Sequence, residues 1–240
     1  MNIQLITIAS GPAHDPNNTF DEMLNSLKVY GLSPTILAWG EEWRGLGTKP
    51  KILLKYLKEN DNSDYTIFFD AYDVLFLAHP EIILKKAHLL YPEAEIVFNA
   101  ERFLFPPDIE NGDALYPPIG EYRYLNSGFF IGLTSSIITF LESLNLDQYP
   151  DDFQKEDGTW HHEQDGKWFL ENFPKQVVPM QLDCNAHLCQ TLHCEPFENF
   201  DVDLSCNEVK NIITNSYPLV LHGNGNGKEN PLMKQLKQKF

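Results

Sequence analysis

A short apolar run, residues 65–69 (YTIFF), ends directly at the motif DAYD of residues 70–73. A continuous hydrophobic segment of this length is typical of a strand that is buried on both faces of a sheet. In open α/β sheets, ligands bind beyond the carboxyl ends of such strands. Asp70 and Asp73 would place two hard oxygen ligands there, which suits a divalent metal held against a nucleotide diphosphate. The pattern favours nucleotide-sugar chemistry, with a turn aspartate and a helix cap as the alternative.

Strand and helix patterns alternate along the rest of the chain. We expect strands at residues 2–9, 33–38, 64–69, 96–98 and 122–133, and helices at residues 17–30, 46–59, 80–90, 134–145 and 162–172. This alternation predicts an α/β fold with a right-handed, mostly parallel central sheet flanked by helices. Residues 101–120 are rich in proline and read as a long irregular loop, a feature that is usually functional. No linker or internal repeat interrupts the pattern, so we expect one domain over residues 1–240.

The charge balance narrows the classes of partner. The formal net charge is −16, which argues against nucleic acid because phosphate binding needs a basic surface. No stretch approaches the roughly 20 apolar residues that a membrane-spanning helix requires. The first residues lack the basic and hydrophobic regions of a signal peptide. We therefore expect a soluble protein, either cytoplasmic or a secretory-pathway domain whose signal has been removed; the oligomeric state stays open.

The four cysteines lie close together, at positions 184, 189, 194 and 206, with His187 and His193 among them. Zinc sites are built from such residues, but the spacing of these cysteines matches no common zinc motif. We expect ordinary buried thiols or one or two local disulfides, and the sequence does not distinguish between them.

A glycine-rich segment follows His222. Glycine backbone can approach phosphates closely and direct N–H groups at them, and Lys228 lies just beyond. An imidazole among carboxylates shifts metal preference from Mg²⁺ or Ca²⁺ toward Mn²⁺. His222 is therefore a candidate third metal ligand and Lys228 a candidate partner for the diphosphate. A solvated surface turn is the alternative.

Three further positions are candidates for recognition of a base or a sugar. Tyr72 and Trp43 offer flat aromatic faces to a base, although an indole on a loop equally often covers the core. Asn126, just before an apolar strand, either binds sugar hydroxyls or makes a turn. Asp165 lies where a helix is expected to begin, and helix capping is its alternative role.

Five segments, taken in chain order, resemble the glycosyltransferase domain of the procollagen lysyl hydroxylases. They are residues 5–9 (LITIA), 40–45 (GEEWRG), 70–73 (DAYD), 125–128 (LNSG) and 222–225 (HGNG). The resemblance covers nearly the whole chain, including the order and spacing of the motifs. It implies a glycosyltransferase-A type fold with a Rossmann-like sheet. It also implies a Mn²⁺-dependent, retaining hexosyltransferase that moves glucose from UDP-glucose to galactosyl-hydroxylysine of a collagen-like acceptor.

The resemblance also implies roles for individual residues. The Mn²⁺ ligands would be Asp70, Asp73 and His222. The uridine and diphosphate would be bound by Thr7, Trp43, Tyr72, Gly225 and Lys228. The residues facing the sugar or the acceptor would be Glu101, Asn126 and Asp165. Asp165 would act either as a nucleophile or, in a same-face attack, by positioning the acceptor hydroxyl.

The sequence departs from the family pattern in two places. Residues 163–166 read EQDG where the family has an acidic run that ends in Asp-Asp-Gln, and Phe105 stands where the family places a tryptophan over the pocket. Two other functions therefore stay open: a related transferase with UDP-galactose or another donor and a different acceptor, or a non-catalytic module that binds sugar nucleotide or collagen. Free-standing members occur in large viruses as well as in animals, so a virus-infected host cytoplasm is one expected setting.

Overall fold

The computed structural model describes residues 2–12, 19–43, 45–60, 62–107, 109, 112–116, 118–146, 153–154, 160–161 and 165–240. For residues 153, 154, 160, 161, 165 and 166 it describes the backbone alone. Among the helices of these residues, none is both long enough and apolar enough to cross a membrane.

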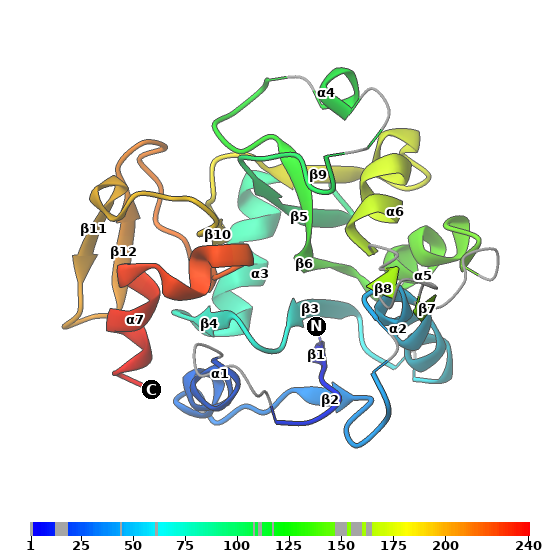
Figure 1. Ribbon diagram of the computed structural model, residues 1–240, viewed down its shortest axis with the longest axis horizontal. Helices are drawn as coiled ribbons and strands as arrows, with labels where there is room; N and C mark the ends of the chain where they lie inside the picture. The colour runs from blue at the N-terminus through cyan, green and yellow to red at the C-terminus, as the bar shows by residue number, and fades with distance from the viewer. Residues whose placement is uncertain are drawn as a thin grey trace.

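A six-stranded sheet forms the centre of the molecule (Figure 1). In spatial order its strands are β2 (Thr35–Leu37), β1 (Ile3–Ile8), β3 (Tyr65–Asp70), β6 (Tyr124–Leu133), β5 (Ile96–Glu101) and β9 (Met180–Asp183). Strand β6 pairs antiparallel with both of its neighbours, whereas the other pairs are parallel. The predicted mostly parallel α/β sheet is confirmed.

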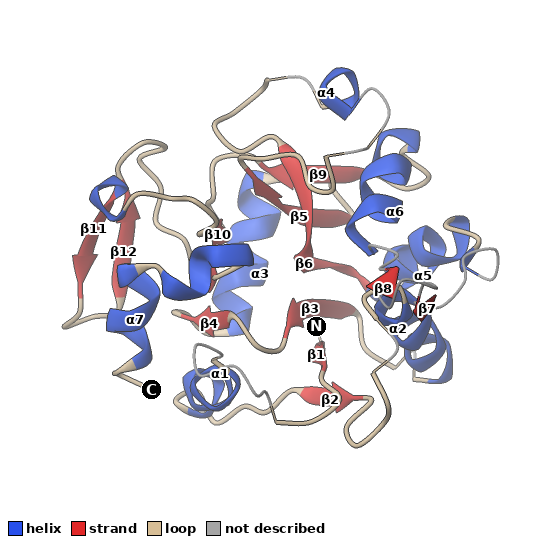
Figure 2. Ribbon diagram, viewed as in Figure 1, coloured by secondary structure: helices blue, strands red, loops and turns tan. Residues whose placement is uncertain are grey.

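Helices cover both faces of this sheet (Figure 2). The longer ones are α1 (Phe20–Lys28), α2 (Thr48–Glu59), α3 (Pro80–Leu90), α5 (Thr134–Ser143), α6 (Asp165–Asn172) and α7 (Pro231–Lys237). The shorter ones are α4 (Gly112–Leu115), η2 (Phe173–Lys175), η3 (Phe197–Asn199) and η4 (Gly225–Glu229). Among its described residues, the region predicted as an irregular loop contains the short helix α4.

Strand β3 joins two hydrophobic cores. Ile67 and Phe69 lie in a cluster with side chains of α1 and α3, whereas Phe68 lies in a second cluster with side chains of α2, α5 and α6. All three side chains are almost fully buried. The prediction that this run is covered on both faces is therefore confirmed, and the burial fixes the position at which the strand ends.

Smaller sheets are built around the carboxyl end of β3 and at the edge of the molecule. The first contains β10 (Cys189–Thr191), β13 (Val220–His222) and β4 (Val74–Phe76). The others are the hairpin of β11 (Phe200–Asp203) with β12 (Glu208–Asn211) and the short pair β7 (Phe153–Gln154) with β8 (Trp160–His161). Because β13 pairs antiparallel with β4, His222 lies opposite Val74, one residue after Asp73.

All four cysteines are free thiols. Cys189 is buried and Cys184 partly so, whereas Cys194 and Cys206 are exposed. Of the alternatives that the sequence leaves open, the structure has thiols rather than disulfides, although only half of these thiols lie in or near the core.

Candidate functional site

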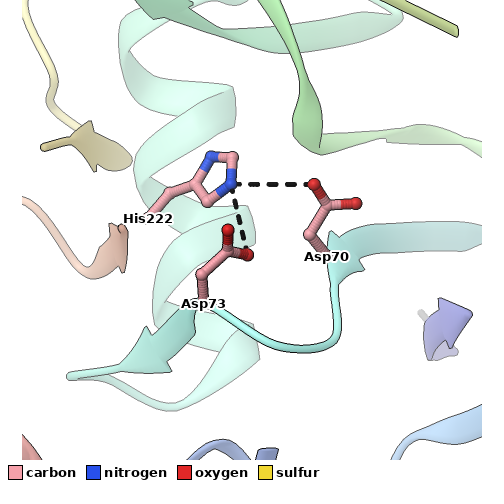
Figure 3. Close-up of side chains that lie close together, drawn as sticks. All are labelled: Asp70, Asp73 and His222. Atoms are coloured by element: carbon pink, nitrogen blue, oxygen red, sulfur yellow. Dashed lines mark ion pairs between the residues drawn. The ribbon is translucent and has the colours of Figure 1, made fainter. Parts of the chain in front are cut away.

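Three side chains point toward one another at the junction of the two sheets: Asp70 at the end of β3, Asp73 just before β4, and His222 at the end of β13 (Figure 3). One ligand atom from each lies within 4.8 Å of the others. The His222 Nε2 atom is 3.5 Å from Asp73 Oδ1 and 3.7 Å from Asp70 Oδ2. The structure thus brings together the three residues predicted as metal ligands.

The surroundings of His222 suit a metal ion. Its side chain is 2% exposed, and neither ring nitrogen makes a hydrogen bond of normal geometry among the described residues, although Nε2 faces both carboxylates. Buried polar atoms are nearly always satisfied, so such an exception needs an explanation. Two carboxylate oxygens and an imidazole nitrogen form a donor set for Mn²⁺ or a similar cation. A cation at this point would satisfy the imidazole and neutralise the carboxylates.

The charges within this cluster are strongly coupled. Burial acts to raise the pKa of Asp73, but the neighbouring His222 and then the ammonium groups of Lys228 and Lys49 lower it overall. Burial acts to lower the pKa of His222, but Asp73 and then Asp70 raise it overall. In the metal-free protein, the structure therefore favours an ionised Asp73 beside a protonated His222.

Gly128 on β6 leaves room for the cluster. A Cβ atom at this position would lie 2.7 Å from Asp70 Oδ2 and 2.8 Å from His222 Nε2. Real Cβ atoms essentially never approach other atoms so closely, and neither neighbour moves freely, because Lys49 pairs with Asp70 and His222 is buried. The backbone of β6 therefore approaches the carboxylate and the imidazole as only a glycine allows.

Lys49 is a site residue that the sequence analysis missed. Its Nζ lies 2.7 Å from Asp70 Oδ1, and its side chain is 9% exposed. A signal was present, because Lys49 lies four and eight residues before Leu53 and Leu57, on the buried stripe of α2. A lysine on an apolar helix face is almost never fully buried unless it is paired.

Two clefts adjoin the carboxylates. The first has a volume of about 350 Å³ and is lined by Trp43, Tyr72 and Lys228, among others. Trp43 is 40% exposed, and the Tyr72 hydroxyl donates a hydrogen bond to the Gly11 carbonyl (2.6 Å), which fixes its ring. The Lys228 Nζ lies 3.9 Å from Asp73 Oδ2. The structure thus brings Trp43 and Tyr72, two of the residues predicted at the uridine, into one cleft with the ammonium group of Lys228. We call this the Trp43 cleft.

The second cleft, about 260 Å³ in volume, lies on the other side of the carboxylates and is lined by Glu101, Asn126 and Asn224, among others. Leu46, Lys49, Asp70 and Asp73 line both clefts. We call this one the Glu101 cleft. The two aspartates therefore line both the Trp43 cleft and the Glu101 cleft and lie where the two adjoin.

Two side-chain amides hold the Glu101 carboxyl group in place. Asn126 Nδ2 donates to Glu101 Oε1 (2.9 Å), and Asn224 Nδ2 donates to Glu101 Oε2 (3.0 Å). Burial raises the pKa of Glu101 to about 7, even though both hydrogen bonds and His222 act to lower it. A carboxyl group with this pKa can hold or release a proton near neutral pH.

The two residues predicted at the diphosphate both belong to η4 but line different clefts. Gly225 has a φ of +57° and lies against the His193 ring in the Glu101 cleft, whereas Lys228 lines the Trp43 cleft. Thr7 is fully buried in β1, and its hydroxyl donates to the Phe69 carbonyl (2.7 Å). A role for Thr7 at uridine stays a prediction. Two residues near Thr7 in the sequence, Ile8 and Ser10, do line the Trp43 cleft.

Asp165 is the first residue of α6, and its side chain lies outside the described residues. Phe105, the residue at the family's tryptophan position, lines the Glu101 cleft and is 55% exposed. Besides Lys49, sequence reasoning missed Asn224 and His193, which also line this cleft. Asn224 was within reach, because it is the polar residue of the HGNG motif.

The fold is that of the glycosyltransferase-A type enzymes. A solved structure of a glycosyltransferase involved in the glycosylation of the major capsid of PBCV-1 superposes with a TM-score of 0.53. The alignment covers 99% of this chain and 100% of that one, at 11% sequence identity. At this identity the likeness concerns the fold alone.

The chain belongs to the PLOD GT domain family, whose model matches residues 1–237. The family resemblance that the motifs indicated is confirmed, and the matching model is that of the family's glycosyltransferase domain.

Similar curated proteins include the multifunctional procollagen lysine hydroxylase and glycosyltransferase of Caenorhabditis elegans, which is 31% identical over 86% of this chain. The human multifunctional procollagen lysine hydroxylase and glycosyltransferase LH3 is 30% identical over 84%. An uncharacterized protein of Acanthamoeba polyphaga mimivirus is 28% identical over 84%. The chain spans 28%, 27% and 42% of these proteins, respectively.

Proposed function

We propose that this chain, acting as one domain, is a Mn²⁺-dependent, retaining glucosyltransferase. Its donor would be UDP-glucose, and its acceptor galactosyl-hydroxylysine of a collagen-like protein. The observation that carries the proposal is the position of Asp70, Asp73 and His222 at the boundary of the two clefts. The sugar and the acceptor are inferred from the names of the relatives, which are procollagen lysine hydroxylases and glycosyltransferases.

The nucleotide would bind in the Trp43 cleft. Trp43 and Tyr72 offer aromatic faces to the uracil ring. Asp70, Asp73 and His222 would hold the Mn²⁺, which when bound supplies positive charge that stabilises a departing diphosphate. Lys228, beside Asp73, would add a second positive charge at the phosphates.

The donor sugar and the acceptor would meet in the Glu101 cleft. There Glu101 and Asn126 present hydrogen-bonding groups for sugar hydroxyls. In a same-face attack, the acceptor oxygen bonds to the anomeric carbon while the bond from that carbon to the β-phosphate oxygen breaks. UDP then leaves with the electron pair and takes the acceptor proton on its phosphate. Asp165 would position the acceptor hydroxyl; a carboxylate nucleophile is the other route to retention.

A second candidate is a related transferase with UDP-galactose or another donor and a different acceptor. The observation that favours it is Phe105, which lines the Glu101 cleft where the family has a tryptophan. A smaller ring at this wall leaves more room for the sugar or the acceptor. A non-catalytic sugar-nucleotide or collagen-binding module is disfavoured, because such a module has no need of the complete Asp70, Asp73 and His222 set.

Release of UDP from UDP-glucose and from UDP-galactose tests the proposal. Each donor is assayed with Mn²⁺ or EDTA, and with or without a galactosyl-hydroxylysine peptide. EDTA-sensitive release from UDP-glucose that depends on the peptide is the expected result. Release from UDP-galactose instead would favour the second candidate. UDP binding with no release from any donor in a wider panel would leave the binding module.

A further inference from the structure

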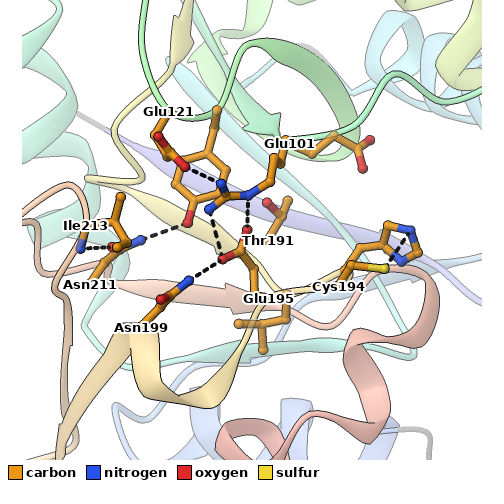
Figure 4. A network of polar contacts seen from close by, with 12 residues as sticks. Glu101, Glu121, Thr191, Cys194, Glu195, Asn199, Asn211 and Ile213 are labelled. Atoms are coloured by element: carbon orange, nitrogen blue, oxygen red, sulfur yellow. Dashed lines mark hydrogen bonds and ion pairs between the residues drawn. The ribbon is translucent and has the colours of Figure 1, made fainter.

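A partly buried polar network joins the end of β5 to the segment that follows β10 (Figure 4). Arg102, the residue after Glu101, donates two hydrogen bonds to Glu195: from Nε to Oε1 (2.8 Å) and from Nη2 to Oε2 (3.2 Å). Its Nη1 group donates to Glu121. Two parallel bonds of this kind fix both the distance and the orientation of the groups they join.

Because Glu195 is buried, loss of this ion pair should have a large effect on the local structure. Its side chain is 1% exposed, and Arg102 is 29% exposed. Asn199 Nδ2 donates a further hydrogen bond to Glu195 Oε2 (3.3 Å). Removal of one partner from a buried pair leaves an uncompensated charge, which costs far more than the loss of an exposed pair.

The pair closes a ring of contacts that returns to the Glu101 cleft. Glu195 follows His193 by two residues, and the N–H groups of Leu192 and His193 both donate to Asn224 Oδ1 (3.1 Å each). The same Asn224 side chain donates to Glu101, and Glu101 precedes Arg102. The Arg102–Glu195 ion pair thus connects the two segments that position Glu101 and Asn224 in the lining of the Glu101 cleft.

Glu195 also reaches the segment that carries Lys228. Its carbonyl oxygen accepts a hydrogen bond from Asn230 Nδ2 (2.8 Å). Asn230 Oδ1 in turn accepts from the Leu232 N–H and caps α7. By contrast, Trp43 and Tyr72 belong to segments that this network does not touch, at the other side of the carboxylates.

We propose that Arg102 and Glu195 form a positioning pair, which sets Glu101 and Asn224 for the transfer of the sugar without itself touching the substrate. This inference rests on the proposed function, since it assigns the sugar and acceptor to the Glu101 cleft. Loss of the pair should impair transfer while UDP still binds in the Trp43 cleft.

The test compares Arg102→Gln, Glu195→Gln and the double variant. We expect each single variant to lose acceptor-dependent transfer by about tenfold or more, chiefly in kcat. Arg102→Gln leaves Glu195 as a lone buried charge, whereas Glu195→Gln breaks both bonds that orient Arg102, which, among the described residues, keeps only Glu121 as a charged partner. The UDP affinity measured with Mn²⁺ should change less than about twofold. The double variant should be no worse than the poorer single variant, because contacting partners are not additive. Lys58→Gln, which breaks the exposed Lys58–Glu142 pair between α2 and α5, is the matched control.

Hydrogen exchange gives a readout that does not depend on activity. The amides of Leu192 and His193 should exchange faster in Glu195→Gln, whereas those of β3 should not. If the wild type transfers no sugar, the proposed function fails. The hydrogen-exchange rates of Leu192 and His193 then still show whether the Arg102–Glu195 pair holds this segment in place. Unchanged kinetics together with unchanged exchange would overturn the positioning role, as would an equal loss of UDP affinity and transfer. Arg102→Lys, which keeps the charge but loses the two-pronged geometry, replaces any variant that does not fold.

Discussion

At the scale of single residues, the site contains ionisable side chains whose burial disfavours their charged form. Glu101 is a carboxyl group whose pKa burial raises to about 7 from 4.5. Because the folded protein binds this proton more tightly than the unfolded chain, stability from this group is present at low pH. It is lost as the pH rises from about 4.5 through 7. Above that range, the ionised Glu101 opposes folding of the metal-free protein.

Glu101→Gln should therefore stabilise the metal-free protein at pH 8. The raised pKa corresponds to about 3 kcal/mol, and the amide loses part of this because its NH₂ group would face one of the two donors, Asn126 Nδ2 or Asn224 Nδ2. We expect a net gain of roughly 1–2 kcal/mol at pH 8 that disappears by pH 5. Thermal unfolding across this pH range measures it, with Glu81→Gln on the exposed face of α3 as the control. An equal effect at both pH values would contradict the assignment.

Gly128→Ala tests the close approach of β6 to the metal ligands. The added methyl group would push Asp70 and His222 apart, so we expect Mn²⁺-dependent UDP binding to weaken by about tenfold or more, as a loss of at least ~1.4 kcal/mol implies. Gly132→Ala is the control in the same strand, because its Cβ would meet Ile96 Cα at 2.9 Å and no site residue. That variant should lose stability but, when folded, keep its UDP affinity. Equal UDP affinity in both variants would argue against the steric account.

At the scale of the elements, helix α2 places a positive charge beside one of the carboxylates that would hold the metal. Lys49 points from the buried stripe of α2 to Asp70 and neutralises part of the carboxylate cluster. An ammonium group at this distance also repels an incoming cation. The helix thus supplies the counter-charge that the metal-free cluster needs, at the expense of metal affinity.

Lys49→Met should accordingly tighten the binding of Mn²⁺ alone. Removal of a repulsion of about 1 kcal/mol predicts roughly a fivefold gain in affinity. Titration followed by the electron paramagnetic resonance signal of free Mn²⁺ measures this directly. Lys55→Met, on the exposed side of the same helix, should leave the affinity unchanged. Weaker Mn²⁺ binding in Lys49→Met would show that the lysine supports the metal site.

At the scale of the whole molecule, the site forms where two sheets meet. The buried run that ends at Asp70 and the alternation of strands and helices suffice to predict the central sheet. The opposite direction of β6 and the small sheet of β4, β10 and β13 depend on pairings between distant segments, which local patterns do not encode. Asp70, Asp73 and His222, which the motif resemblance assigns to one metal site, do lie together in the structure.

The same distant pairings explain what the sequence could not supply. Lys49 and Asn224 reach the site only because α2 and the end of β13 are packed beside it. The exposed Cys194 and Cys206 have no periodic pattern that would distinguish them from buried thiols. Residues on the central strands are thus more predictable than those on connections, since only the former carry a periodic signal.

The binding of UDP with and without Mn²⁺, in the wild type and in Asp73→Ala, tests the central claim most directly. If Asp70, Asp73 and His222 hold the metal against the donor, Mn²⁺ should raise the affinity of the wild type for UDP by about tenfold or more. The same ion should have no effect on Asp73→Ala, whose fold is checked by circular dichroism. A dependence on Mn²⁺ that is unchanged in Asp73→Ala, or absent from the wild type, would contradict the account.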